Sequence, residues 1–277
     1  MIHLIKNVSI AFKRPKLALK YLGWLTKCFL SNGAPVRNLH GIRFTNFNGF
    51  SEYHSLGAGV SQEELAFINS WPFGDGVMID VGANLGLFSL LLSKRYPDRR
   101  VLAFEPSPST CSALKVNVIE NGARMVECFQ KAIADREGFV AFSVREHARA
   151  NASIRDDVLP PTPGDIQVPC TSLDAVCAAE DIGRIAMLKV DVEGYESLVF
   201  RGAAAVLSRV RPDVIYFEVC PGLTKAAGFG VAESAKCLAD HGYSLHRFKA
   251  GGGFELANAD EVADVLRVEN WVAVASQ

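Results

Sequence analysis

The sequence predicts an α/β fold in which helices cover both faces of a mostly parallel sheet. From residue 77 onwards, short apolar segments typical of strands alternate with segments of helical periodicity, which is the pattern of β–α–β units. The last two predicted strands have no full helical crossover between them, so we expect an antiparallel pair at one edge of the sheet. The chain has 277 residues, of which 49% are hydrophobic, and it can therefore bury a full hydrophobic core.

Two elements are expected before the alternating region begins. Residues 15–30 (PKLALKYLGWLTKCFL) read as a helix with Pro15 in its first turn, where proline is tolerated. Residues 41–50 (GIRFTNFNGF) are expected to form a short strand or hairpin.

A further helix is expected at residues 61–71. Ser61 as the N-cap and Glu64 three residues later form the capping-box pattern. The following stretch, WPFGDG, breaks the chain. We therefore divide the sequence into an N-terminal basic helix with a cap or lid segment, residues 1–72, and a sheet domain, residues 73–277.

The sheet domain is expected to contain seven strands with helices between them. Gly122 ends one of these helices and Ser172 caps another. Residues 138–144 are expected to add a strand at an edge, and the proline-containing residues 145–165 a long loop. The expected strands are residues 76–82, 100–106, 125–134, 185–194, 212–219, 243–248 and 270–276. The expected helices are residues 85–96, 108–122, 172–182, 194–210 and 231–242.

The turn after the first of these strands indicates a ligand site. In MIDVGANLGLFSL (residues 78–90), Asp80 is followed by Gly82 and Gly86 where the strand gives way to a helix. Ligands of open parallel sheets bind outside the carboxyl ends of the strands. We expect Gly82 to allow a tight turn and a close ligand, and Gly86 to let the helix pack on the strand. A dinucleotide site requires G-x-G-x-x-G, which is missing, and the Asp80 carboxylate suits an ammonium group better than a pyrophosphate.

Glu105 closes the second strand of the sheet domain. A carboxylate at this position can accept hydrogen bonds from the two hydroxyls of a ribose, each worth on the order of 1.5–3 kcal/mol. One acid for an ammonium group and one for a ribose describe S-adenosylmethionine better than NAD.

Four segments resemble the FkbM family of S-adenosylmethionine-dependent methyltransferases. They are IDVGANLGLFSL, AFEPSPSTCSALKVNVIENG, TSLDAV and LKVDVEGYESLVFRGAAAVLSRVRPDVIYFEV, and they lie between about residues 77 and 220. The K-x-D-x-E-G-x-E block is the most specific part. The resemblance implies a class I methyltransferase (Rossmann-like) fold, with a seven-stranded sheet whose last strand is antiparallel. It also implies O-methylation, commonly of sugars, polysaccharide precursors or polyketide-type natural products.

The resemblance further implies where S-adenosylmethionine binds. The cofactor loop of the family falls on Asp80, Gly82, Asn84 and Gly86, and its ribose acid on Glu105. Apart from the resemblance, Asp135, after the third strand, is expected either to meet the adenine amino group or to be exposed at the surface. The full set of expected cofactor-binding residues is Asp80, Gly82, Ala83, Asn84, Gly86, Glu105, Pro106, Asp135 and Asp191.

Candidates for a general base follow the fourth strand of the sheet domain (MLKVDVEGYE). A base within hydrogen-bond reach of the acceptor hydroxyl accelerates its reaction roughly 10²–10⁴-fold. Strand alternation brings Asp191 to the carboxyl end beside the cofactor, with Glu193 in the next turn. His54, in the cap segment, is the third candidate, since a neutral histidine suits proton transfer near pH 7.

Structural roles remain as alternatives for these residues. Glu193 and Glu196 could complement the N-terminus of the next helix, Lys189 could pair with an acid such as Glu218, and a lone histidine is more often structural or solvated. No metal is expected, although Asp191 with Glu193 or Glu218 could hold Mg²⁺. In the long loop, His147, Asn151 and Ser153 could reach the site if that loop closes over it.

The N-terminal region is basic. Residues 1–51 contain eight basic and no acidic side chains, whereas the whole chain has a net charge of −1. Lys13, Lys16, Lys20 and Lys27 share a narrow arc of the first helix, and apolar residues cover much of the rest. Residues 13–30 could therefore contact an anionic membrane, or form a cap helix that packs on the sheet domain. No nucleic-acid partner is expected, because the sheet domain is acidic and the basic region lacks a base-stacking pattern.

The expected compartment is the cytoplasm, with residues 13–30 as the element that would hold the protein at the inner face of the membrane. The sequence has no signal-peptide pattern, and its seven scattered cysteines contain no CxxC pair. The expected function is therefore methyl transfer from S-adenosylmethionine to a hydroxyl of a small-molecule or glycan acceptor. The alternatives are an NAD-dependent oxidoreductase and a non-catalytic module that binds a cofactor or a membrane. The acceptor and the oligomeric state, for which a dimer is one option, are not determined by the sequence.

Overall fold

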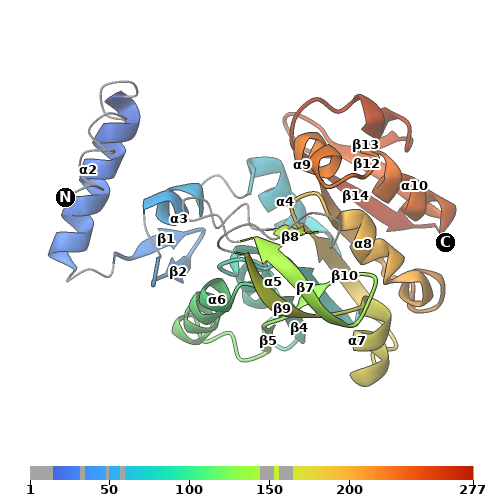
Figure 1. Cartoon of the computed structure of the whole chain (residues 1–277), viewed down its shortest axis with the longest axis horizontal. Coiled ribbons are helices and arrows are strands. Elements are labelled where there is room, and N and C mark those ends of the chain that lie inside the picture. The colour runs from blue at the N-terminus through green and yellow to red at the C-terminus, as the bar shows by residue number, and fades with distance from the viewer. Residues whose placement is uncertain are drawn as a thin grey trace.

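A central sheet of eight strands organises the protein (Figure 1). The computed structural model describes residues 15–31, 35–47, 50–56, 60–143, 153–155 and 165–276. The strand order is β13-β12-β14-β11-β10-β3-β4-β5, in which the five strands from β11 to β5 are parallel. The strands span Val77–Val81 (β3), Val101–Phe104 (β4), Val126–Phe129 (β5), Ile185–Val190 (β10), Val214–Val219 (β11), Tyr243–Phe248 (β12), Phe254–Ala257 (β13) and Glu269–Ala275 (β14).

The seven strands expected from the sequence are all in this sheet. β12 and β14 form the predicted antiparallel pair, with β14 next to β11, but this pair is not the edge of the sheet. The edge is taken by β13, which pairs with β12 through the loop at Gly251–Gly253 and adds an eighth strand. This order results from tertiary pairing, which the local pattern of each segment does not encode.

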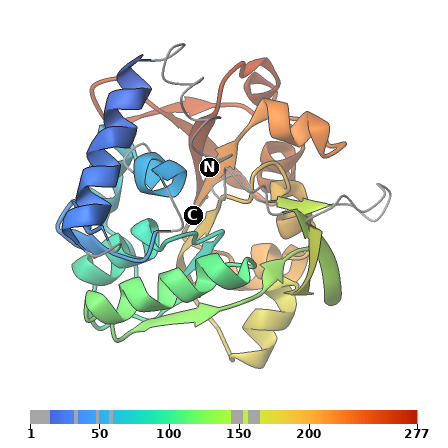
Figure 2. The same cartoon turned by 60° about the vertical axis from the view of Figure 1, so that its left-hand side comes forward.

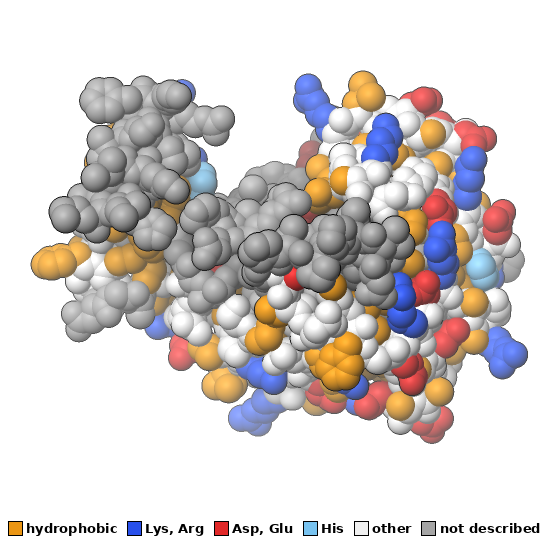
Figure 3. Space-filling view, in the orientation of Figure 1, with side chains coloured by type: hydrophobic (Ala, Val, Ile, Leu, Met, Phe, Trp, Pro, Cys, Tyr) orange, Lys and Arg blue, Asp and Glu red, His pale blue; other side chains and the backbone are white. Residues whose placement is uncertain are grey.

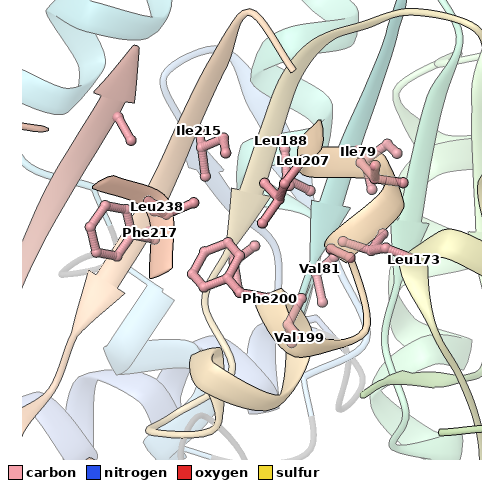
Figure 4. Close-up of a cluster of buried hydrophobic side chains, with 14 of the residues drawn as sticks. Ile79, Val81, Leu173, Leu188, Val199, Phe200, Leu207, Ile215, Phe217 and Leu238 are labelled. Atoms are coloured by element: carbon pink, nitrogen blue, oxygen red, sulfur yellow. The ribbon is translucent and has the colours of Figure 1, made fainter. Parts of the chain in front are cut away.

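Two layers of helices cover the sheet. On one face, β-branched, leucine and phenylalanine side chains of the strands pack against α7, α8, η3 and α10 (Figure 4). On the other face, Met78 and Met187 pack with side chains of α4, α5 and α6. The helices span Gln62–Ser70 (α4), Leu87–Arg95 (α5), Pro108–Glu120 (α6), Leu173–Ala179 (α7), Glu196–Arg201 (α8), Val206–Val210 (η3, a π-helix), Pro221–Ala226 (α9), Glu233–Asp240 (α10) and Glu261–Asp264 (η4, a 3₁₀ helix).

The single helix expected at residues 194–210 is divided into α8 and η3. A Cβ atom on Gly202 would lie 2.0 Å from the carbonyl oxygen of Ala134, so only glycine lets this segment approach the neighbouring backbone. The helix is thus interrupted at Gly202, the residue at which the chain comes closest to the backbone of Ala134.

A second sheet lies beside the first, in the order β6-β9-β7-β8. Its strands span Ala132–Ile133 (β6), Gly138–Ser143 (β7), Ser153–Arg155 (β8) and Asp165–Thr171 (β9). The expectation that residues 138–144 extend the main sheet is therefore wrong, and the strand expected at 125–134 is divided between the two sheets. β7 pairs along its whole length with β9, and this non-local pairing draws it away from the main sheet.

The N-terminal elements follow the sequence closely. α2 spans Pro15–Leu30 as expected, but the hairpin consists of β1 (Arg37–Leu39) and β2 (Ile42–Phe44), so that only β2 lies within the expected residues 41–50. Ser61 and Glu64 form the predicted capping box of α4. α3 (Phe50–Ser55) was not expected; it lies beside α2 at one end of the molecule (Figures 1 and 2).

Side chains from both sides of residue 72 share one core. Phe44 and Ile68 are buried with Met78, so the residues of the hairpin and of α4 pack directly on the sheet. The boundary between residues 1–72 and 73–277 stays a prediction. Among the described residues, no helix has the length and apolarity needed to cross a membrane.

Candidate functional site

A cavity of about 800 Å³ opens at the carboxyl ends of β3, β10 and β11. Its walls come from the turn after β3, the ends of β10 and β11, the helices α3 and α4, and the segment around β12 and β14. The position agrees with the rule that ligands of open parallel sheets bind at this end of the strands. Seven acidic side chains line it: Glu52, Glu63, Glu64, Asp191, Glu193, Glu218 and Glu269.

The two glycines of the turn are required by packing within the protein. Gly82 has φ +81°, and a Cβ atom there would lie 1.8 Å from the carbonyl oxygen of Asp191. Gly86 has φ +90°, and its Cβ would lie 2.4 Å from a methyl group of Leu114 in α6. The space beside Gly82 that the sequence assigned to a ligand is therefore occupied by the backbone after β10.

The amide groups of this turn are largely used within the protein. The N–H groups of Gly82 and Ala83 donate to the carbonyl oxygen of Phe104, and that of Gly86 donates to Ala83. The N–H of Asn84 donates to the carboxylate of Glu105 at 3.0 Å. A pyrophosphate site needs such N–H groups to point at the ligand, so this turn is poorly suited to a dinucleotide.

Glu105 lies directly behind the turn, at the end of β4. Its side chain is buried, and its two oxygens accept hydrogen bonds from the N–H groups of Asn84 and Ser107, next to Pro106. Burial raises the pKa of Glu105 to about 7, although these two hydrogen bonds and the charge of Lys189 act in the opposite direction. Each carboxylate oxygen has a second lone pair for the hydroxyls of a ribose.

Asp80 is fully buried and is paired inside the protein. One oxygen accepts hydrogen bonds from the N–H and the hydroxyl of Ser89 in α5, at 3.1 and 2.6 Å. The other lies 3.0 Å from the ammonium nitrogen of Lys189. Asp80 was expected to bind the ammonium group of a ligand, but its ammonium partner is the side chain of Lys189. Asn84 has a buried side-chain oxygen with no hydrogen-bond partner in the described chain, and this oxygen is free to accept from a ligand ammonium.

Lys189 also reaches the cavity. Its Nζ lies 3.3 Å from a carboxylate oxygen of Asp191 and donates to the carbonyl oxygen of Gly82 at 3.1 Å. Burial disfavours its charged form, but the carboxylates of Asp191 and Asp80 outweigh this effect and raise the pKa of Lys189 above its ordinary value. The sequence named Glu218 as an example of a partner acid for this lysine; the structure brings Asp80 and Asp191 to it.

Glu193 and Glu218 form the acidic wall beyond Asp191. Burial and repulsion from Asp191 and Glu196 raise the pKa of Glu193 to about 8. Burial and the neighbouring carboxylates of Asp191, Glu193 and Glu196 also raise the pKa of Glu218, to about 10. Glu193 has φ +57°, a left-handed conformation that is strained for a residue with a Cβ atom. Strained backbone and raised carboxyl pKa values concentrate at functional sites.

Glu196 has the structural role that the sequence offered as an alternative. It begins α8, and one of its oxygens accepts from the N–H groups of Val192 (3.0 Å) and Gly194 (3.2 Å). Burial raises the pKa of Glu196 to about 7 in spite of these hydrogen bonds. Glu196 therefore holds the turn that carries Glu193 into the cavity.

Six expected site residues are not among those that line the cavity: Asp80, Gly86, Glu105, Pro106, His54 and Asp135. His54 is not among the residues that line the cavity; its ring stacks on Phe50 and its Nε2 lies 3.3 Å from the ammonium nitrogen of Lys20. Burial and the charges of Lys20 and Arg37 lower the pKa of His54. Asp135 is exposed and pairs with Arg136 at 3.3 Å. His147 and Asn151 lie outside the described residues.

The structure adds a network that sequence reasoning missed. The hydroxyl of Tyr216 in β11 donates to Glu64 at 2.8 Å, and the amide of Asn270 donates to the same oxygen. Arg247 forms two hydrogen bonds to Glu269 at the other side of the cavity. Glu64 was recognised only as half of a capping box, and no local signal joins it to residues more than 150 positions away.

Potential cation ligands meet at one point of the cavity wall. A carboxylate oxygen of Glu193, one of Glu218 and the sulfur of Cys220 all lie within 4.8 Å of one another. Burial raises the pKa of the Cys220 thiol to about 11, and a metal ligand must lose its proton. The expectation that no metal is needed stays a prediction.

The comparison with protein families identifies the central part of the chain. Residues 80–245 match the family model described as the methyltransferase FkbM domain. This region contains the turn after β3, Glu105, and the cluster from Lys189 to Glu218.

Individual relatives are similar over parts of their length. "Methyltransferase 1" of Beauveria bassiana is 28% identical over 47% of this chain, which spans 60% of that protein. The 31-O-demethyl-FK506 methyltransferase FkbM of Streptomyces tacrolimicus is 28% identical over 61% of this chain and 73% of its own. The hexuronic acid methyltransferase AglP of Haloferax volcanii is 28% identical over 49% of this chain and 53% of its own. Among solved structures, an O-methyltransferase family protein from Burkholderia thailandensis aligns with 80% of this chain and 57% of its own, at 12% identity and a TM-score of 0.44.

Proposed function

Starting from the fact that this chain belongs to the FkbM methyltransferase family, we propose that it transfers a methyl group from S-adenosylmethionine to a hydroxyl of a sugar, a polysaccharide precursor or a related natural product. The relatives named above support the acceptor class, since one acts on a hexuronic acid and another on a demethylated FK506. The main observation behind the proposal is that the turn after β3 and the segment of Lys189, Asp191 and Glu193 line one cavity together.

The residues around the turn fit S-adenosylmethionine. The buried Glu105 carboxylate has lone pairs left for the two ribose hydroxyls. The unpartnered side-chain oxygen of Asn84 suits the ammonium group of the methionine part. When bound, this cofactor supplies a methyl group on a positively charged sulfur.

The acceptor hydroxyl must lose a proton, and Glu193 is the residue best suited to accept it. Its pKa, raised to about 8, lies close to neutral pH, where a carboxylate is a stronger base than at its ordinary value. Asp191 lines the same cavity, and the Lys189 ammonium holds its carboxylate in place. We assign the proton transfer to Glu193, with Asp191 orienting the acceptor. His54 remains the less favoured candidate, because it does not line the cavity.

We place the protein in the cytoplasm. All seven cysteines are free and four of them are buried, as is typical of a protein folded in a reducing compartment.

The test is transfer of a labelled methyl group from S-adenosylmethionine to a panel of neutral sugars, uronic acids and macrocyclic alcohols. We expect a methyl ether as the product, and a kcat lowered about 10²–10⁴-fold in Glu193→Gln. His54→Gln is the matched comparison and is expected to retain kcat within about threefold. Equal losses in both variants would exclude Glu193 as the single base.

Calorimetry distinguishes the proposed methyl transfer from the two alternatives, an NAD-dependent oxidoreductase and a non-catalytic module. Binding of NAD without binding of S-adenosylmethionine would favour an oxidoreductase and overturn the proposal. Binding of S-adenosylmethionine with no transfer to any member of the panel would instead favour a non-catalytic module.

A further inference from the structure

Helix α2 has two apolar faces, and the described residues of the chain pack against one of them. Tyr21 and Trp24 pack against Phe50 of α3, with ring centroids 5.2 and 6.0 Å apart. The other face carries large side chains that are between 39% and 84% exposed. We call this the outer face of α2; it consists of Leu19, Leu22, Leu25, Phe29 and Leu30.

Such a face is unusual for a surface helix. The five side chains span about 17 Å of the helix, at 1.5 Å per residue, and positions three or four apart lie on one side. α2 stands at one end of the molecule, with α3 as its neighbour, and Figure 3 shows hydrophobic side chains on the surface at this end. Contiguous exposed apolar patches of this kind mark interaction sites.

Lysines border the outer face. Lys16, Lys20 and Lys27 are exposed and form a row along α2, between the outer face and α3; the ammonium of Lys20 lies 3.3 Å from Nε2 of His54, and that of Lys27 donates to the hydroxyl of Tyr53. The charge distribution of the whole chain also makes this end of the protein positively charged. Of the 29 basic residues, eight lie in residues 1–51, where there is no acid, while all 30 acidic residues follow.

We infer that the outer face of α2 docks on the surface of an anionic lipid bilayer. An apolar helix face bordered by lysines is the pattern of a helix that lies in the membrane interface. The acidic remainder of the chain is repelled by such a surface, so the charge distribution also selects the orientation in which α2 faces the lipid. This inference concerns binding and does not depend on the proposed methyl transfer.

A second copy of the chain fits this surface less well. A symmetric contact between two outer faces would bring two regions together that each carry eight basic and no acidic residues. A convex helix at the end of the molecule also offers no groove for a partner helix, whereas a bilayer adapts to it.

Docking through α2 would also fix the position of one wall of the cavity relative to the bilayer. Phe50, Tyr53 and His54 of α3 hold α2, while Glu52 and Leu56 line the cavity from the same short segment. The lipid-bound protein would therefore hold α3, and with it this wall of the cavity, at the end of the molecule that faces the bilayer.

The test is co-sedimentation of the full chain with vesicles. We expect binding to vesicles of phosphatidylcholine with one quarter phosphatidylglycerol, little binding to phosphatidylcholine alone, and weakening between 50 and 500 mM salt. The double variant Leu22→Glu/Phe29→Glu is expected to bind at least tenfold more weakly, and Lys16→Glu severalfold more weakly.

The matched control is Leu256→Glu/Leu266→Glu, which places the same charges on side chains 73% and 91% exposed, far along the chain in the C-terminal region. It should bind anionic vesicles like the native protein. The inference is overturned if native protein and Leu22→Glu/Phe29→Glu bind equally, or if neither vesicle binds native protein. It is also overturned if light scattering shows a native dimer that this variant abolishes while no vesicle binding occurs, since the face is then a contact between copies.

Discussion

The ammonium nitrogen of Lys189 lies 3.0 Å from a carboxylate oxygen of Asp80 on the adjacent strand, and both side chains are buried. Because the same ammonium also contacts Asp191 and the carbonyl oxygen of Gly82, one lysine joins the turn after β3 to the segment that carries Asp191 and Glu193. The expected ammonium site of the cofactor is in this way already filled from within the protein.

Replacing this lysine should destabilise the fold. Lys189→Met keeps the length of the side chain but leaves the Asp80 carboxylate buried without its partner, which typically costs about 3–5 kcal/mol. Urea denaturation measures the loss in the free energy of unfolding. Lys236→Met is the matched control, because Lys236 pairs with Asp260 at the surface, where such pairs contribute at most about 1 kcal/mol. Similar losses in both variants would contradict the supporting role of Lys189.

Removing the carboxylate of Glu105 should weaken the binding of S-adenosylmethionine. Loss of even one hydrogen bond between this acid and a ribose hydroxyl, worth about 1.5 kcal/mol or more, predicts a Kd at least about tenfold higher for Glu105→Ala. Calorimetry gives the Kd, and circular dichroism checks the fold, since Glu105 also accepts from Asn84 and Ser107. Glu120→Ala, an exposed acid at the end of α6, should bind normally. Unchanged affinity in Glu105→Ala would remove this residue from the site.

Gly82 should not tolerate a side chain. In Gly82→Ala the new Cβ would lie 1.8 Å from the Asp191 carbonyl oxygen, at φ +81°, and we expect a loss of about 3 kcal/mol or more. Gly122→Ala separates the effect of the steric clash from that of the left-handed backbone. Gly122 also has positive φ (+62°) but open space beside it, so this variant should lose only about 1–2 kcal/mol. Thermal or urea unfolding measures both. Equal losses would show that backbone conformation alone requires glycine at position 82.

The acidic wall should make stability fall as pH rises. The pKa of Glu193 is raised from 4.5 to about 8 in the folded protein, so the folded state binds this proton more tightly than the unfolded state. The contribution of the Glu193 carboxyl group to the free energy of unfolding is therefore complete below about pH 4.5 and is lost as the pH rises through about 8.

Glu193→Gln removes this ionisation. The free energy of unfolding of the variant should match that of the native protein near pH 5, exceed it near pH 8.5, and vary less between the two. Glu255→Gln, an exposed acid on β13, is expected to leave the pH dependence unchanged. A native protein whose stability rises from pH 5 to 8.5, with no change in that trend in Glu193→Gln, would contradict the raised pKa.

Local patterns in the sequence predicted the elements that depend on neighbours in the chain. The helix at 15–30, the capping box of Ser61 and Glu64, and six of the seven expected strands of the main sheet are confirmed, while the strand expected at 125–134 is divided between the two sheets. The family resemblance is confirmed as well, because it rests on contiguous segments. The second sheet and the position of β14 were not predicted, since β7 with β9 and β11 with β14 pair strands whose contacts leave no local signal.

The sequence by itself determined that an acid–glycine turn, an acid closing the next strand and the Lys189–Glu193 segment belong to one α/β domain. Only the tertiary structure decided which groups each of them meets. Asp80 faces Lys189 instead of a ligand, Gly82 faces the backbone after β10, and Glu218 joins Glu193 at the cavity. The physical reason is that charge pairing and close backbone contact depend on distances across the sheet, and these distances are set by strand order, which spacing along the chain does not record.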